Sequence, residues 1–128
     1  MKRSSFGIVG IALAALAVAC NPLDPNQAIL LDVSNASAPA TIPPNTPLTI
    51  TLTVLTSGCR MFDRIVVQRL ANGVILAAFG QSIKGGNCAA GFQNELHSVT
   101  LDPPFSSPFS IQVDGGTLPP ITTSVTVQ

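Results

Sequence analysis

The sequence predicts an all-β fold, an antiparallel sandwich of about seven strands, for the chain that follows a short apolar leader. Aliphatic and hydroxyl side chains alternate with a period of two in several segments, which is typical of half-buried strands. Eleven prolines and ten glycines fall mostly between these segments. Beyond the leader no segment keeps helical spacing over three turns, so we expect one β domain over residues 28–128.

Residues 1–19 predict a signal peptide helix that is removed from the mature protein. Lys2 and Arg3 give a positive start, an apolar run follows, and the small residues Ala17 and Ala19 lie at its end. The apolar run is shorter than the roughly 20 residues that a membrane-spanning helix needs. We therefore expect export of the chain.

Residues 16–20, Leu-Ala-Val-Ala-Cys, resemble the lipobox of bacterial lipoproteins. The resemblance covers about the first twenty residues and departs from the commonest pattern at Ala17, where that pattern has Leu. It implies that Cys20 carries a diacylglycerol on its sulfur and that the protein is anchored to a membrane of the cell envelope through this lipid. Asn21, rather than Asp, follows the cysteine, which in the general pattern favours the outer membrane or the cell surface. Residues 20–27, with two prolines, predict an extended tether.

The same residues support a second interpretation of the leader. Ala17 and Ala19 also satisfy the A-x-A rule of ordinary signal peptidase, which would release a secreted protein with a free thiol at Cys20. An unpaired thiol in an oxidising compartment is prone to mispairing, whereas acylation removes it. The lipoprotein is therefore favoured, and secretion is the alternative.

Residues 48–55, LTITLTVL, give the clearest strand, because aliphatic side chains alternate with threonines. Asn72-Gly73 lies between two β-prone runs, 64–71 and 74–83, and predicts an antiparallel hairpin closed by a type I′ turn. The other expected strands are residues 28–33, 94–101, 109–113 and 121–127. Seven strands in about 100 residues favour an immunoglobulin-like sandwich, although the tryptophan of antibody domains is absent.

The two remaining cysteines, Cys59 and Cys88, are expected to form a disulfide. Two cysteines in one small exported domain usually pair. Closing a loop of roughly 30 residues stabilises a fold by about 3 to 4 kcal/mol on the chain-entropy model. Cys20 is then the odd cysteine, as the lipoprotein interpretation requires.

The charge balance argues against nucleic acid as a partner. Without the leader, Lys2 and Arg3 are lost, and four basic residues face six acidic ones. The net charge is then about −2, whereas nucleic-acid binding rests on many Lys and Arg contacts to phosphate.

The side chains that metal chemistry requires are few. His97, the one histidine, shares an expected strand face with Val99 and follows Glu95 by two residues. A metal site needs three or four ligands, and Glu95, His97 and Asp102 have no recognised ligand spacing. We therefore expect no metal and no cofactor.

Nucleophilic catalysis is also not expected. A Cys88–His97 pair would need a free thiol, and Ser82 and Lys84 lack the S-x-x-K spacing. The G-x-S-x-G, P-loop and dinucleotide motifs do not occur. The sequence therefore predicts no catalytic residues and a protein that is not an enzyme.

Around the first half-cystine, the segment GCRMFDRIVVQR contains a candidate binding patch made of Arg60, Phe62, Asp63 and Arg64. One interpretation is a docking surface for a protein or an anionic envelope polymer. The other, which we favour, is an ion pair and a core aromatic ring beside the disulfide.

Two connections have a similar double interpretation. Residues 34–47 are proline-rich and residues 84–92 are glycine-rich, and either could bind a partner. We favour ordinary connections between strands for both.

Taken together, these features favour a lipid-anchored cell-envelope protein with a non-catalytic structural or protein-binding β-sandwich domain. The alternative is a secreted or periplasmic inhibitor or chaperone-like module that offers an edge strand or residues 34–47 to a client. A remote alternative is a hydrolase that uses His97 with an acid. The domain also resembles small β-rich lipoproteins in which Cys-x-x-Phe-Asp precedes a strand, here Cys59, Phe62 and Asp63, and this resemblance implies no activity.

Overall fold

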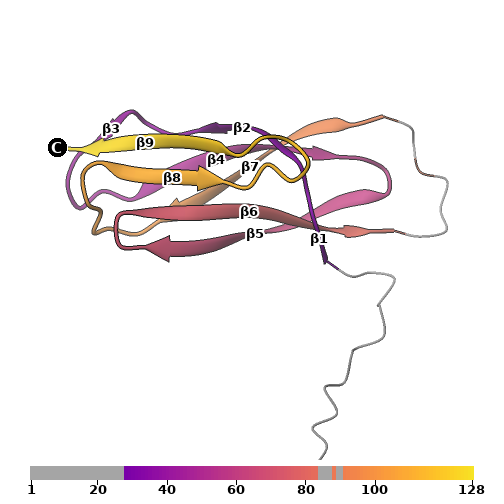
Figure 1. The fold of residues 1–128 in the computed structure, drawn as a ribbon, viewed down its shortest axis with the longest axis horizontal. Coiled ribbons are helices and arrows are strands. Elements are labelled where there is room, and N and C mark those ends of the chain that lie inside the picture. Colours follow the sequence, from indigo (N-terminus) through magenta and orange to yellow (C-terminus); the bar gives the residue numbers. More distant parts are fainter. Residues whose placement is uncertain (1–27, 84–87, 89–90) are drawn as a thin grey trace, which may run out of the picture.

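The computed structural model describes residues 28–83, 88 and 91–128, which form nine strands and no helix (Figure 1). The strands are β1 (Ala28–Leu30), β2 (Val33–Ser37), β3 (Thr41–Ile42), β4 (Leu48–Thr56), β5 (Arg60–Leu70), β6 (Gly73–Ser82), β7 (Gln93–Leu101), β8 (Phe109–Val113) and β9 (Ile121–Val127). They form a six-stranded and a three-stranded sheet, an arrangement compatible with a β-sandwich. The expected all-β class is therefore confirmed. The predicted signal peptide, lipidation site and tether lie outside the described residues.

The larger sheet is built around β6, which pairs with three strands. β5 runs antiparallel along one edge of β6 over its whole length. On the other edge, β1 pairs antiparallel with the end of β6, and β8 pairs parallel with its beginning. β9 continues the sheet antiparallel to β8, and the two-residue β3 pairs parallel with the end of β9, beside the C-terminus (Figure 1).

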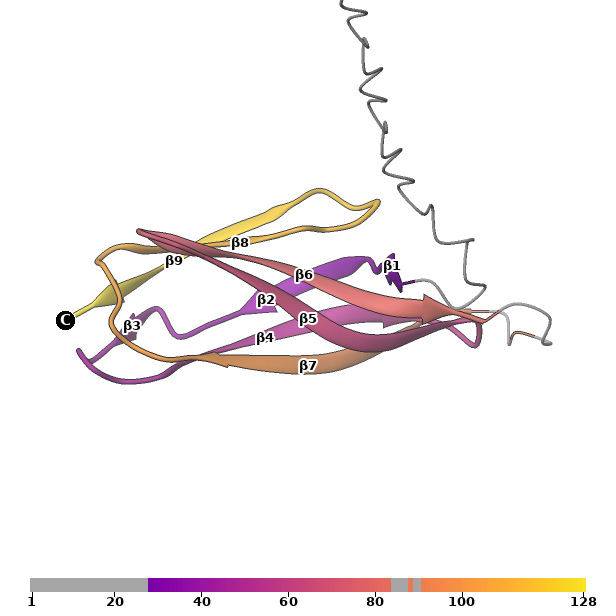
Figure 2. The same ribbon diagram turned by 90° about the horizontal axis from the view of Figure 1, so that it is seen from below.

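The smaller sheet has the order β2-β4-β7 and is antiparallel throughout. β4 and β7 pair from Leu48 opposite Leu101 to Thr56 opposite Gln93 without a shift in register. Figure 2 shows the two layers, with β8 and β9 in one and β4 and β7 in the other.

Two details of the expected architecture are wrong. The sheets are not purely antiparallel, since β6–β8 and β3–β9 are parallel pairs. The described residues also form nine strands rather than about seven, because the expected strand 28–33 is divided in two and Thr41–Ile42 forms a further short strand. Ala28–Leu30 joins β6 in the larger sheet, whereas Val33–Ser37 joins β4 in the smaller one. Residues 34–47 accordingly contain most of β2 and all of β3 and are not a wholly irregular connection.

The hairpin of β5 and β6 is confirmed, but its turn is not the expected type I′. Gly73 already pairs with Leu70, so the two turn residues are Ala71 and Asn72. Neither has a positive φ; the one described non-glycine residue that does is Asn45, at 61°. A Cβ atom on Gly73 would meet the carbonyl oxygen of Ser110 in β8. The glycine is therefore needed for the close approach of β8 rather than for the turn.

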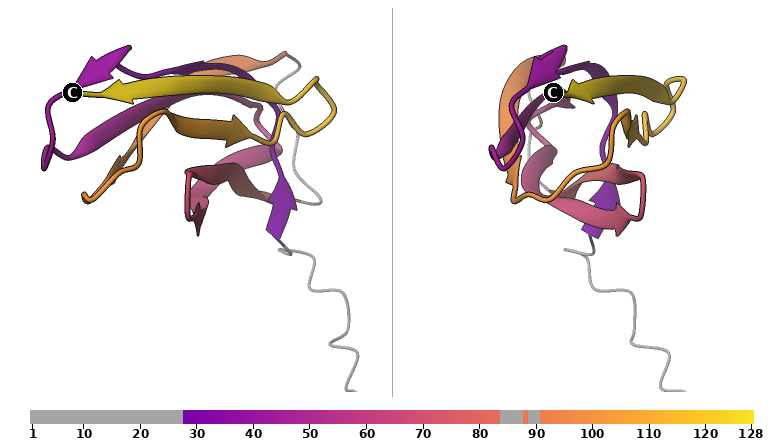
Figure 3. Two further views of the ribbon diagram at one scale, coloured as in Figure 1. Left: turned by 60° about the vertical axis from the view of Figure 1, so that its left-hand side comes forward. Right: turned by 90° about the vertical axis from the view of Figure 1, so that its left-hand side faces the viewer.

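The core lies between the two sheets and is formed by the alternating side chains that the sequence indicated. The inward residues of β4 are Leu48, Ile50, Leu52 and Val54, all 0% exposed. Facing them are Phe109, Ile111 and Val113 of β8, at most 1% exposed, with Ser110 and Gln112 turned outward. Viewed along the long axis, the strands are arranged around a common centre (Figure 3).

Candidate functional site

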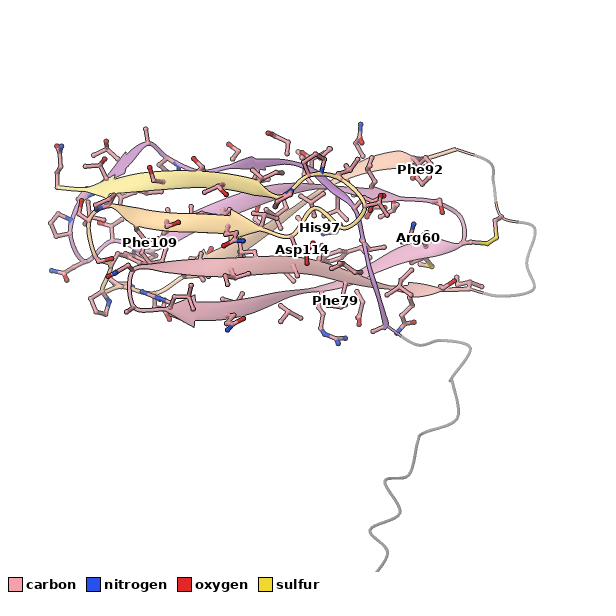
Figure 4. All side chains as sticks on the ribbon, viewed as in Figure 1. Arg60, Phe79, Phe92, His97, Phe109 and Asp114 are labelled. Carbon is pink, nitrogen blue, oxygen red and sulfur yellow. A yellow bond between two sulfur atoms is a disulfide. The ribbon has the colours of Figure 1, made fainter. Side chains whose placement is uncertain are left out.

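A cleft of about 560 Å³ opens at the end of the molecule that carries the disulfide. It lies between the end of β4, the beginning of β5 and the beginning of β7. Its lining includes Thr56, Met61, Phe62, Phe92, Glu95 and His97. Figure 4 shows Phe92 and the disulfide at this end, and Phe109 toward the opposite end.

The expected disulfide between Cys59 and Cys88 is confirmed. The two Cα atoms are 5.2 Å apart, within the range that a disulfide bridges. Cys59 immediately precedes β5, and its carbonyl oxygen accepts a hydrogen bond of 2.8 Å from the amide of Ile83, just after β6. The disulfide therefore joins Cys88 to the end of the β5–β6 hairpin that borders the cleft.

Aromatic stacking joins the two sheets across this cleft. Phe62 comes from β5 of the larger sheet and His97 from β7 of the smaller one. Their ring centroids are 3.5 Å apart and their planes differ by 14°. β5 and β7 are edge strands of their sheets, so the stack holds together two edges that no backbone pairing connects in the described residues.

His97 also forms a pair with Glu95, which lies two residues before it on the same strand face. The distance from His97 Nε2 to Glu95 Oε2 is 2.9 Å. This hydrogen bond is the main reason why the pKa of Glu95 lies below its ordinary value, and a hydrogen bond from Thr56 lowers it further. Thr56 is only 3% exposed and lies at the end of β4. The cleft therefore holds a fixed carboxylate–imidazole pair beside an aromatic ring.

Asp102, the third residue of the set weighed for metal binding, does not join this pair. It follows the last residue of β7, whereas Glu95 lies near the beginning of the strand. At about 3.3 Å per residue, that separation is roughly 20 Å. In residues 28–83, 88 and 91–128, no group of three His, Cys, Asp or Glu side chains could hold a metal ion.

The four residues of the candidate binding patch contact different parts of the structure. The Arg60 guanidinium donates a hydrogen bond of 3.1 Å to the carbonyl oxygen of Leu30, while Phe62 faces His97. Arg64 forms an ion pair of 2.7 Å with Asp63 at the surface, and its guanidinium lies 5.9 Å from the Phe79 ring centroid. These four residues therefore do not form one continuous surface.

A bulge in β5 explains this division. The register of β5 against β6 shifts between Phe62 and Arg64, which leaves Asp63 as the extra residue. Residues two apart in a regular strand share a face, but a bulge breaks that rule. Phe62 can therefore pack against the core while Arg64 faces outward. Neither composition nor spacing signals a bulge at this position.

The exposed apolar side chains of β5 have no signal in the sequence. Val66, Val67 and Leu70 are 40%, 38% and 44% exposed. The segment RIVVQRL has the composition of an interior strand, and only the strand order places it at an edge. Three further exposed apolar residues, Met61, Ile83 and Phe92, lie at the cleft end.

The Glu95–His97 pair predicts a pH-dependent contribution to stability. Because the folded protein lowers the pKa of Glu95, its carboxylate stabilises the fold above its ordinary pKa, and this stabilisation is lost as the pH falls through the lowered value. The Glu95 side chain is 41% exposed, so solvent screening keeps the effect below about 1 kcal/mol.

We expect Glu95→Gln to lower the melting temperature slightly at pH 7. At pH 2 to 3 the variant and the wild type should have the same melting temperature. An equal difference at both pH values, measured by circular dichroism, would contradict the assignment.

The chain matches no protein-family model, and neither the curated proteins nor the solved structures contain a significant match to it. Over the part of the chain that the structure describes, no helix is long and apolar enough to cross a membrane.

Proposed function

We propose that this protein is a lipid-anchored component of the cell envelope, attached through Cys20, whose β domain binds another envelope protein and carries out no catalysis. The lipobox-like residues 16–20 support the anchor. The Cys59–Cys88 bond supports export, since disulfides persist in oxidising compartments. The binding mode is β-strand addition to β5.

The open edge of β5 is the observation that carries the binding function. From Met61 to Leu70, β5 pairs with β6 along one side only, whereas the other side of Arg60 forms a bridge with Ser57. The backbone groups on its other side can pair with an added strand, and Val66, Val67 and Leu70 supply apolar contacts on both faces.

Charged side chains, which often protect natural edge strands, do not cover the middle of β5. Residues 65–68 carry no charge. Arg69 is engaged elsewhere, since its guanidinium donates a 2.8 Å hydrogen bond to the carbonyl oxygen of Asp102 and lies 4.7 Å from the Phe105 ring centroid. Arg64 is paired with Asp63. The central stretch is therefore available to a partner strand.

The other sheet edges are less suited to this role. β3 pairs over only two residues and β2 is five residues long. β7 is nine residues long, and its outward face carries one exposed apolar residue, Leu96, among three polar ones: Asn94, Ser98 and Thr100. β1 is apolar but only three residues long, so β5 is the longest of the edge strands in the described residues.

Site-specific photo-cross-linking in the native envelope tests this mode. A photoreactive residue in place of Val66 should give a discrete adduct with another protein. The same residue in place of Thr122, which is exposed on β9, should give none. Adding Val67→Lys to the first variant should remove the adduct, because a charge at an edge opposes strand pairing. No adduct at position 66, or equal adducts at both positions, would contradict binding at β5.

A secreted or periplasmic inhibitor or chaperone-like module is the second candidate, because the same open edge would serve it. A chaperone would hold its client in an extended form, whereas an envelope component would bind a folded partner. Hydrogen exchange of the cross-linked partner separates the two, since only a folded partner keeps slow amides away from the contact.

For the fold itself we propose a relationship to immunoglobulin-like sandwiches. The sheet β2-β4-β7 corresponds to the A-B-E order of those domains, and the hairpin β8–β9 corresponds to F–G. In this correspondence β5 is strand C, but β6 lies between it and β8. The immunoglobulin-like strand order therefore applies to this chain only if the β5–β6 hairpin is placed differently than in those domains.

A further inference from the structure

Three exposed apolar side chains gather at the disulfide end of the molecule: Met61, Ile83 and Phe92, which we call the apolar tip. They are 53%, 40% and 69% exposed. Met61 and Phe92 line the same cleft, and Ile83 is joined by its amide to the carbonyl of Cys59, two residues before Met61. Single exposed apolar residues are ordinary, whereas a group of them at one place marks an interaction site.

The chain enters the described fold at this same end. Ala28 pairs with Gln81 of β6, and Gln81 pairs on its other side with Met61 of β5. These three residues thus form one row across the sheet. With neighbouring strands about 4.8 Å apart, the Cα atoms of Ala28 and Met61 are separated by roughly 10 Å.

The length of chain before Ala28 limits how far this end can lie from a lipid on Cys20. Eight residue steps separate Cys20 from Ala28. At roughly 3.3 to 3.6 Å per residue they span at most about 29 Å. The β5–β6 turn with Leu70 lies at the far end of β6, about 30 Å farther from the membrane attachment when the strands stand upright. The lipid attachment therefore lies closer, along the chain and the sheet, to the apolar tip than to the turn.

The charges near the tip do not select anionic lipids. Among the described residues at this end, the two positive charges of Arg60 and Arg64 are outnumbered by three carboxylates, those of Asp32, Asp63 and Glu95. Membrane binding by an apolar group with no surplus of positive charge depends on the buried apolar area rather than on attraction to anionic lipids.

We propose that the apolar tip contacts the interfacial region of the lipid bilayer, so that the domain stands on the membrane with its disulfide end down and the β5–β6 turn away from it. The proposal rests on the lipid anchor at Cys20 described above. It would leave β5 upright, with its open edge accessible to a neighbouring envelope protein.

Tryptophan fluorescence tests the orientation, because the chain contains no Trp and no Tyr. The full-length protein, purified with its native lipid, carries either Phe92→Trp at the tip or Leu70→Trp at the turn. Leu70 is a matched control, since it is 44% exposed at the opposite end. Each variant is reconstituted into phosphatidylcholine vesicles with or without bromine atoms on the acyl chains. We expect Phe92→Trp to lose most of its emission in the brominated vesicles and Leu70→Trp to keep its emission, at both low and high salt.

The possible outcomes distinguish contact of the apolar tip with the bilayer from attachment of the chain through its lipid. Flotation of Phe92→Trp with the vesicles without quenching would overturn the tip contact and leave the anchor standing. Equal quenching of the two variants would overturn the upright orientation. If the protein carries no lipid, the anchor fails. Quenching of Phe92→Trp by added vesicles would then still support a tip contact, and its absence would overturn it. Met61→Ser in the Phe92→Trp background should weaken the quenching.

Discussion

Replacing Phe109 by alanine is expected to lower the free energy of unfolding by about 3 to 5 kcal/mol, the usual cost of removing a buried aromatic ring. Phe109 is 1% exposed and opens β8, which lies between β6 and β9. Its ring meets Phe105 edge to face at 5.0 Å, and the Arg69 guanidinium lies 5.4 Å from its centroid. The substitution removes all of these contacts and leaves a cavity between the sheets.

The matched control is Phe92→Ala, which removes the same ring from a side chain that is 69% exposed. It should change the unfolding free energy by no more than about 0.5 kcal/mol. Urea unfolding of both variants and the wild type measures the difference. Similar losses for the two variants would contradict the placement of the core between β4 and β8.

The second large effect is expected from the disulfide. The double variant Cys59→Ser, Cys88→Ser should be less stable than the oxidised wild type by about 3 to 4 kcal/mol, because the bond closes a loop between residues 29 apart and restricts the unfolded chain. For a domain of this size, each kcal/mol changes the melting temperature by roughly 4 to 8 °C.

The control for this prediction is Cys20→Ser, which should leave the melting temperature of the domain unchanged. Melting of the wild type with and without a reductant gives an independent measurement. A wild type that melts at the same temperature in both conditions would contradict a stabilising role for the bond.

Local alternation was sufficient to predict the strands that line the core. In 48–55 and 109–113 every second side chain is apolar, and these side chains are the buried ones. The division of 28–33 was not predictable in this way. Ala28–Leu30 and Val33–Ser37 pair with strands of different sheets, and such pairing depends on contacts between residues far apart in the chain. The parallel pairing of β6 with β8 has the same cause, since β7 of the other sheet lies between them in sequence.

The sequence predicted the placement of Glu95 and His97 on one strand, but not their pairing in a cleft. Glu95 and His97 share one strand, so their spacing placed them on one face, and the structure joins them. The stacking of Phe62 on His97 depends on the bulge at Asp63 and on the approach of two sheet edges, neither of which has a sequence signal. For the same reason the four residues of the candidate patch, adjacent in sequence, face different neighbours.

We propose above all that the protein is a lipid-anchored domain closed by one disulfide. The most direct test is its intact mass after extraction in detergent from the native membrane. The mass is measured before and after reduction and alkylation. We predict the mass of the chain from Cys20 with an added diacylglycerol, and two alkylated thiols, those of Cys59 and Cys88, that appear only after reduction. An unlipidated chain with a Cys20 thiol that reacts before reduction would contradict the account.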